Sequence, residues 1–256
     1  MIDKKKLLSP ELIAIATGNP AAIANRCTSA DHRLACQLLG LTVGLFGLSL
    51  QVHAAGGHHA VDDAAILAPG QCQLETWFDR DSHGARSLIH IGPACRVGPV
   101  ELGLNLDNTH VTDIGATTAV GPQIKWAHQL TEALSAGVVF GANWQDRSPS
   151  FVASTVVFPL TWAASETVTI HVNVGRDFRR GGEPDTDRAG AALEWAPVPA
   201  WTFVAERFRE SNMDHWRAGV RYVLSQNASI DLSRAKGLHG SEPAWWTVGL
   251  SWAFAR

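Results

Sequence analysis

The stretch "VELGLNLD", residues 100–107, decides the fold class, because polar and apolar residues alternate through it without a break. One parity carries Val100, Leu102, Leu104 and Leu106. A strand points successive side chains to opposite faces, so this period of two predicts one apolar face and one wet face. In a soluble sandwich the apolar face would meet a second sheet, whereas in an outer-membrane barrel it would meet lipid. The rest of the chain must decide between them.

The same alternation recurs after Gly70 and predicts twelve strands, an even number, as bacterial outer-membrane barrels require. The connections between these strands alternate in length. Short connections are predicted near residues 97–99, 129–131, 163–166, 196–200 and 225–227. Longer polar connections are predicted near residues 108–116, 145–150, 178–187, 210–215 and 235–243, with a short first hairpin around His83. With both termini in the periplasm, the short set would be periplasmic and the long set extracellular.

The ten tryptophans fall at the ends of the predicted strands. One rim would hold Trp126, Trp162, Trp195, Trp201 and Trp252, and the other Trp77, Trp144, Trp216, Trp245 and Trp246. Such girdles place amphipathic rings at the headgroup level of a bilayer. The sequence therefore predicts an all-β protein: a transmembrane antiparallel β-barrel of about 12 strands (10–12) over residues 71–256, in contact with the lipid bilayer of a Gram-negative outer membrane.

An apolar run, "LACQLLGLTVGLFGLSL" at residues 34–50, follows Arg33. It is typical of a secretory signal peptide, with Val52 and Ala54 as the cleavage pair, so residues 1–54 are predicted to be a leader that export removes. A single transmembrane anchor is the competing interpretation, because about 17 residues is the lower limit for a helical span. Residues 1–33 are assigned no function.

Cys72 and Cys95 would remain in an oxidising compartment and could pair. In a hairpin about residues 83–84, equal offset sets Cys72 opposite Cys95 and Leu74 opposite Pro93. Pro93 has no N–H to donate, so that pair should be a non-hydrogen-bonded one, and the cysteines share its parity. A cross-strand disulfide is predicted, and two free buried thiols are the alternative.

Charged side chains on the polar face of the strands are the candidate functional residues. They comprise Glu75, Arg96, Glu101, Lys125, His171, Glu194, Glu206, Arg217 and Arg221. Seven of them are predicted to set lumen selectivity: Glu101, Lys125, His171, Glu194, Glu206, Arg217 and Arg221. The structural alternative is that they pair across a filled lumen and hold the barrel shut.

Residues 55–70, ahead of the barrel, are predicted to be a mobile segment, a plug or a gate. His58 and His59, with two aspartates close behind, could bind a metal, and a chain starting at residue 56 would offer a Gly-Gly-His site for Cu(II) or Ni(II). Cleavage after Ala54 would leave His58 fourth, and neighbouring histidines in a mobile segment can also be merely solvated.

Catalytic motifs and nucleic-acid signals are weak. The net charge of -3 gives no reason to expect a nucleic-acid partner, and no cofactor is predicted. "SRAK" at residues 233–236 matches S-x-x-K without the other motifs of that enzyme class. An outer-membrane lipid-modifying enzyme stays open as an alternative, since Ser82, His83, His110, His215, His239 and Ser241 fall in predicted outer loops.

The stretch "VDDAAILAPGQCQLETWF", residues 61–78, resembles the start of the barrel in the outer-membrane family associated with the MetA pathway of phenol degradation. "VAERFRESNMDHWRAGVRYVLS" and "VGLSWAF" are similar to that family's last strands. The matching residues are Asp62, Asp63, Pro69, Gly70, Gln73, Leu74 and Glu75. The resemblance implies a barrel that passes small, often apolar or aromatic, compounds.

The closing "WWTVGLSWAFAR" resembles the C-terminal signal of outer-membrane proteins, which implies the barrel-assembly machinery as a partner. The leading functional hypothesis is a passive channel or uptake protein for a small-molecule solute, and not an enzyme. A metal-binding or purely structural barrel is a further alternative.

Overall fold

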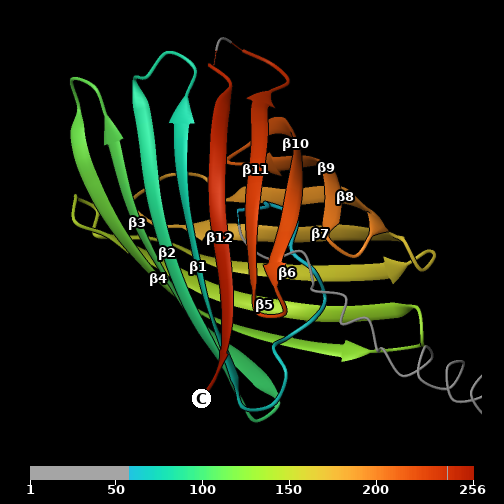
Figure 1. The fold of residues 1–256 in the computed structure, drawn as a ribbon. Helices are drawn as coiled ribbons and strands as arrows, with labels where there is room; N and C mark the ends of the chain where they lie inside the picture. The colour runs from blue at the N-terminus through green and yellow to red at the C-terminus, as the bar shows by residue number, and fades with distance from the viewer. Residues whose placement is uncertain (1–57, 241) are drawn as a thin grey trace, which may run out of the picture. The chain divides into compact units, whose positions relative to one another are not determined.

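Twelve antiparallel strands form a closed barrel in the computed structural model, which describes residues 58–240 and 242–256 (Figure 1). The strands are β1 (Gln71–Asp81), β2 (Arg86–Val97), β3 (Val100–Val111), β4 (Gly115–Gln129), β5 (Leu134–Gln145), β6 (Phe151–Ala163), β7 (Val168–Arg179), β8 (Thr186–Val198), β9 (Trp201–Glu210), β10 (Met213–Ser225), β11 (Ala228–Gly237) and β12 (Trp245–Ala255). The predicted fold class and strand number are confirmed. The predicted signal peptide lies outside the described residues.

Each strand pairs with its neighbours in sequence, and β12 returns to β1 to close the barrel (Figure 1). The closing register runs from Gln71 opposite Ala255 to Asp81 opposite Trp245. Closure leaves no edge strand with unpaired backbone groups, which is the condition for spanning hydrocarbon with strands. No helix in the described part of the chain is long and apolar enough to cross a membrane.

The leucines of residues 100–107 face outward. Leu102, Leu104 and Leu106 are 45%, 36% and 37% exposed, whereas Glu101 and Asn105 turn inward. Within residues 58–240 and 242–256 no second sheet covers the leucines, because the twelve strands described there belong to one barrel. Their exposure is therefore that of a lipid-facing surface. Apolar side chains point outward and polar side chains inward, as in an outer-membrane barrel.

Eight of the ten tryptophans also point outward: Trp126, Trp144, Trp162, Trp195, Trp201, Trp216, Trp246 and Trp252. The girdle assignment is wrong for Trp77 and Trp245. Trp77 shares the inward parity of Glu75 and Asp79, and its ring stacks on His90 at 3.5 Å. Trp245 packs against a small lumen cluster that contains Phe208. A tryptophan near a strand end belongs to a girdle only when its parity is outward.

Cys72 and Cys95 form the predicted disulfide between β1 and β2. They lie directly opposite each other, as do Leu74 and Pro93. The Cα atoms of the two cysteines are 4.0 Å apart, the close approach of a non-hydrogen-bonded pair. The β2–β3 ladder skips Pro93, in keeping with the missing N–H of proline.

Two outer connections are much shorter than predicted. Residues 112–114 join β3 to β4, and residues 211–212 join β9 to β10. Both turns use left-handed residues, with φ of 68° at Asp113 and 63° at Asn212. The strands extend into stretches predicted to be loops, as where Asn108, Thr109 and His110 pair with β4. Polar residues there resemble loop residues in sequence even though they still pair.

Candidate functional site: the barrel lumen

Residues 58–69, called the lumen segment below, lie inside the barrel and form no strand. His58, Val61, Asp63 and Ala64 are each 5% exposed or less. The segment bonds to inward side chains of β3, β4, β6, β9 and β10, so it crosses the lumen instead of leaving it. Gly70, with a φ of 78°, then turns the chain into β1.

At the β2–β4 wall, Lys125 and Glu101 anchor the segment. Lys125 Nζ donates to Asp62 and to Asp63, both at 2.8 Å. Glu101, directly opposite Lys125 in the register, accepts the N–H of Leu67 at 2.9 Å. The Leu67 carbonyl accepts from Arg96 of β2 at 2.9 Å. Wall residues of opposite charge thus hold both the side chains and the backbone of the lumen segment.

At the β9–β10 wall, Glu206 and Arg217 also anchor the lumen segment. The Glu206 carboxylate accepts the N–H groups of Ala60 and Val61 at 3.2 Å and 3.0 Å. Arg217 donates to Glu206 at 3.0 Å and to the carbonyl oxygen of His58. Glu206 and Arg217 lie directly opposite each other, so their ion pair lies within the wall and does not require the lumen segment. Charge-assisted bonds of this kind are about twice as strong as neutral ones.

Between these anchors the segment meets β6, β7 and β8. Thr161 accepts the N–H of Ala64 at 2.8 Å. With its amide nitrogen turned toward the Asp62 carbonyl, the orientation that satisfies both amide atoms, Asn173 donates to that oxygen at 2.8 Å and accepts the Asp62 N–H at 2.6 Å. Gly190 supplies room, because a Cβ there would lie 2.6 Å from a Val61 methyl. The wall is therefore shaped to the segment as well as charged to match it.

A second buried network joins the remaining predicted residues. His171 Nε2 is 3.7 Å from Glu194, Glu194 is 3.8 Å from Arg221, and Arg221 Nε donates to Asp231 at 2.8 Å. Thus all seven predicted lumen residues lie on the inner wall, and two groups of them meet at the segment or at this network. Their role in selectivity stays a prediction.

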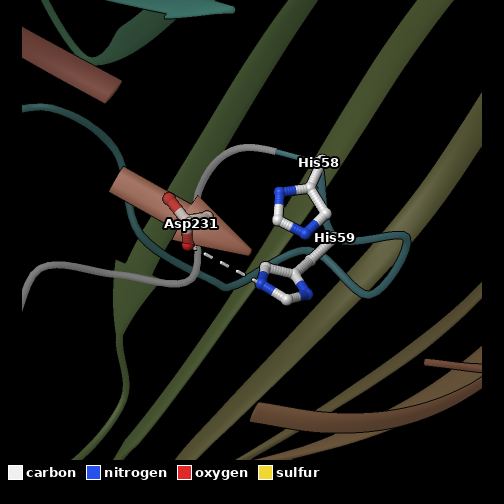
Figure 2. Close-up of side chains that lie close together, drawn as sticks. All are labelled: His58, His59 and Asp231. Atoms are coloured by element: carbon white, nitrogen blue, oxygen red, sulfur yellow. Dashed lines mark ion pairs between the residues drawn. The ribbon is translucent and has the colours of Figure 1, made fainter. Parts of the chain in front are cut away.

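His58 and His59 lie close to Asp231 of β11 (Figure 2). One donor atom from each of the three lies within 4.8 Å of the others. The two rings are 4.4 Å apart between centroids, and His59 Nε2 is 4.0 Å from Asp231. Both histidines are buried in the lumen, so the expectation that they are merely solvated does not hold.

Ser233 donates to or accepts from His58 Nε2 at 2.6 Å, which resembles the serine–histidine part of a hydrolase site. Two features separate it from such a site. Nδ1 of His58 has no hydrogen-bond partner among the described residues, so no carboxylate of that part of the chain orients the ring, and Ser233 is only 2% exposed. Lys236 points outward while Ser233 points inward, so the S-x-x-K residues do not converge.

The structure places the predicted outer-loop histidines in different surroundings. His215 was placed in an outer loop, and that is wrong. It is an inward residue of β10, buried between Phe208 and Trp245. His110 is opposite Ser87 at the top of β3, on an exposed face. Ser241 lies outside the described residues.

Four wall residues of the site were not among the predicted lumen residues: Thr161, Asn173, Asp231 and Ser233. Parity could have found Asp231 and Ser233, because Ile230 and Leu232 between and beside them face outward. No local signal marks Thr161 or Asn173 as contacts of the lumen segment, since those contacts join positions 97 or more residues apart.

The chain belongs to the family described as "Uncharacterised conserved protein UCP029691", whose model matches residues 44–254. No curated protein matches it significantly. The resemblance to the phenol-degradation family is not confirmed.

Two solved structures show a similar fold. The chain is similar to the KdgM porin, with a TM-score of 0.57 and 10% identity over 71% of this chain and 99% of that one. It is also similar to the NanC porin, with a TM-score of 0.56 and 10% identity over 70% and 98%. At such identity the likeness shows the fold, that of outer-membrane porins.

Proposed function

We propose that the protein is an outer-membrane channel for small polar solutes and that the lumen segment is its gate. The observation that carries the proposal is the match between wall and segment. Glu101, Lys125, Glu206 and Arg217 project from four strands into the lumen and bond a stretch of chain that is not part of the wall. A charged wall is costly in a sealed core but suits a water-filled conduit once the segment leaves.

The type of solute follows from the wall. Cations and anions face each other on neighbouring strands in three directly opposed pairs, Glu101 with Lys125, Glu206 with Arg217, and Asp231 with Arg221. Such paired charges favour solutes that offer hydrogen bonds and balanced charge over purely apolar ones. The KdgM porin has been described in complex with oligogalacturonate, which makes sugar acids a reasonable first class to test.

The filled lumen also supports a second candidate, a closed structural barrel. In that case the seven charged residues would only hold the segment and keep the wall shut. An outer-membrane lipid-modifying enzyme has less support, because the Ser233–His58 pair is buried and lacks a third member. Targeting by the leader and insertion by the barrel-assembly machinery through β12 are part of the proposal.

The test is solute flux into proteoliposomes for the wild type and for a loosened variant, Lys125→Met with Glu206→Gln. The double variant removes the cation between Asp62 and Asp63 and weakens the acceptor of two backbone N–H groups. A channel predicts slow entry of a pentose and of galacturonate into wild-type vesicles and at least tenfold faster entry into variant vesicles. Val172→Leu, on the lipid face, is the matched control and should behave as the wild type.

Equal impermeability of the wild type and the loosened variant, with both shown to be folded by their heat-dependent gel mobility, would overturn the channel and favour the structural barrel. Lipid turnover by either protein would favour the enzyme instead.

A further inference from the structure

His58, His59 and Asp231 bring two imidazole groups and one carboxylate together inside the lumen (Figure 2). The two histidines come from the lumen segment, and the aspartate comes from the barrel wall. Two imidazoles with one carboxylate are a donor set that suits divalent transition metals, zinc among them. The three groups therefore join the two parts of the gate through one potential ligand set.

One ring nitrogen of His58 is already held by a hydrogen bond. His58 uses Nε2 for its 2.6 Å bond with Ser233, and its Nδ1 has no hydrogen-bond partner within the described part of the chain. His59 turns Nε2 toward Asp231, and its Nδ1 is 3.6 Å from Glu206. Metal-binding histidines almost always have their other ring nitrogen held by a carboxylate, carbonyl or water. Ser233 occupies this supporting position for His58, whereas Glu206 lies 3.6 Å from His59 Nδ1, just beyond hydrogen-bond distance.

The charges around the cluster favour a cation. Glu194, Glu206 and Asp231 form ion pairs with only two guanidinium groups, those of Arg217 and Arg221, among the ion pairs of the described residues. With neutral imidazoles, these five groups carry one surplus negative charge. All five are buried to 6% exposure or less, and an uncompensated buried charge is unfavourable.

We propose that His58, His59 and Asp231 bind one zinc-class divalent ion, which ties the lumen segment to the wall at β11. In the structure His59 Nε2 is 4.0 Å from Asp231. Ligand atoms around tetrahedral zinc lie roughly 3.3 Å apart at bond lengths of about 2.0–2.1 Å. The side chains therefore close inward by about 1 Å on binding, and water completes the coordination. The site itself is independent of the proposed channel, whereas its effect on gating depends on it.

The test is zinc binding to the refolded full-length barrel in detergent, after chelator treatment, by competition with a chromophoric zinc indicator. The proposal predicts one Zn²⁺ per barrel, with affinity lowered at least tenfold in His59→Gln and in Asp231→Asn. His128→Gln is the matched control, because His128 is exposed on the outer wall beside Trp126, and it should bind as the wild type. Visible absorption of the Co²⁺ form reports the coordination directly.

Each variant must show the same heat-dependent gel shift, so that lost binding is not lost folding. Absence of saturable Zn²⁺ binding by the wild type, or equal affinity in all folded variants, would overturn the site.

The tie to the wall has its own readout, amide hydrogen exchange of residues 58–69. Zn²⁺ should slow exchange at Ala60 and Val61 in the wild type but not in His59→Gln. Zn²⁺ binding without slower exchange would contradict the attachment of the lumen segment to the wall by the metal. The channel is tested separately, by solute flux measured without added metal.

Discussion

Val174→Arg tests the lipid-facing surface quantitatively. Val174 is 55% exposed on β7, and Ile170, four residues earlier on the same face, lies opposite Trp162 of the aromatic girdle. Four residues span roughly 14 Å of strand, or about 10 Å of depth at a tilt of 35–45°, which is close to the middle of an apolar band about 25 Å tall. Arginine at the midplane of a barrel costs about 2–4 kcal/mol.

That cost lowers the folding equilibrium constant by roughly 30-fold to 900-fold. The assay is reversible urea titration in lipid vesicles, with the folded fraction read from unboiled gel mobility. Thr169→Arg is the control, because Thr169 faces the lumen directly opposite Glu194 and its guanidinium would meet a carboxylate instead of lipid. Equal stability of Val174→Arg and the wild type in the same lipid would refute the assignment of the two faces.

Three further variants test the disulfide and the lumen segment. Replacing both Cys72 and Cys95 by serine should lower the free energy of unfolding by about 3 kcal/mol, from the loop that the bond closes over a separation of 23 residues, as a shifted urea midpoint would show. Lys125→Met leaves two aspartates without their cation, and the loss of a buried partner costs about 3–5 kcal/mol, so hydrogen exchange of the lumen segment should accelerate while that of β7 does not. Gly190→Ala places a Cβ 2.6 Å from Val61 and should loosen the same segment by about 1–3 kcal/mol. Unchanged exchange in both of the last two variants would contradict the described contacts.

The barrel could be predicted from the sequence because its strands carry a strong local signal. Lipid outside and polar groups inside force a period of two, so Leu102 and Val172 reveal their face without any knowledge of their partners. The same rule placed Glu101, Lys125 and Arg217 on the inner wall. Parity also explains the Cys72–Cys95 bond, since the centre of the turn fixes which residues lie opposite in a hairpin.

The site was less predictable, because it is made by contacts between distant parts of the chain. Residues 55–70 have no period, so the sequence left a plug, a gate and a mobile segment equally open. Their partners Thr161 and Asn173 are ordinary inward residues in sequence, and only the closed barrel brings them to Ala64 and Asp62. The girdle assignment of Trp77 and Trp245 was wrong for a related reason. It used their position at the strand ends and not the parity of their side chains.

The gate can be tested most directly by locking it. Ala64→Cys with Thr161→Cys places thiols at a contact where the Ala64 N–H bonds the Thr161 side chain at 2.8 Å, so oxidation should bond the segment to β6. In planar bilayers, channel openings should be present in the reduced double variant, vanish on oxidation and return with reductant, while the wild type and each single variant stay unaffected by the same treatments. Openings that persist with the segment bonded to the wall would contradict the gate, and a folded barrel that never opens in any redox state would contradict the channel.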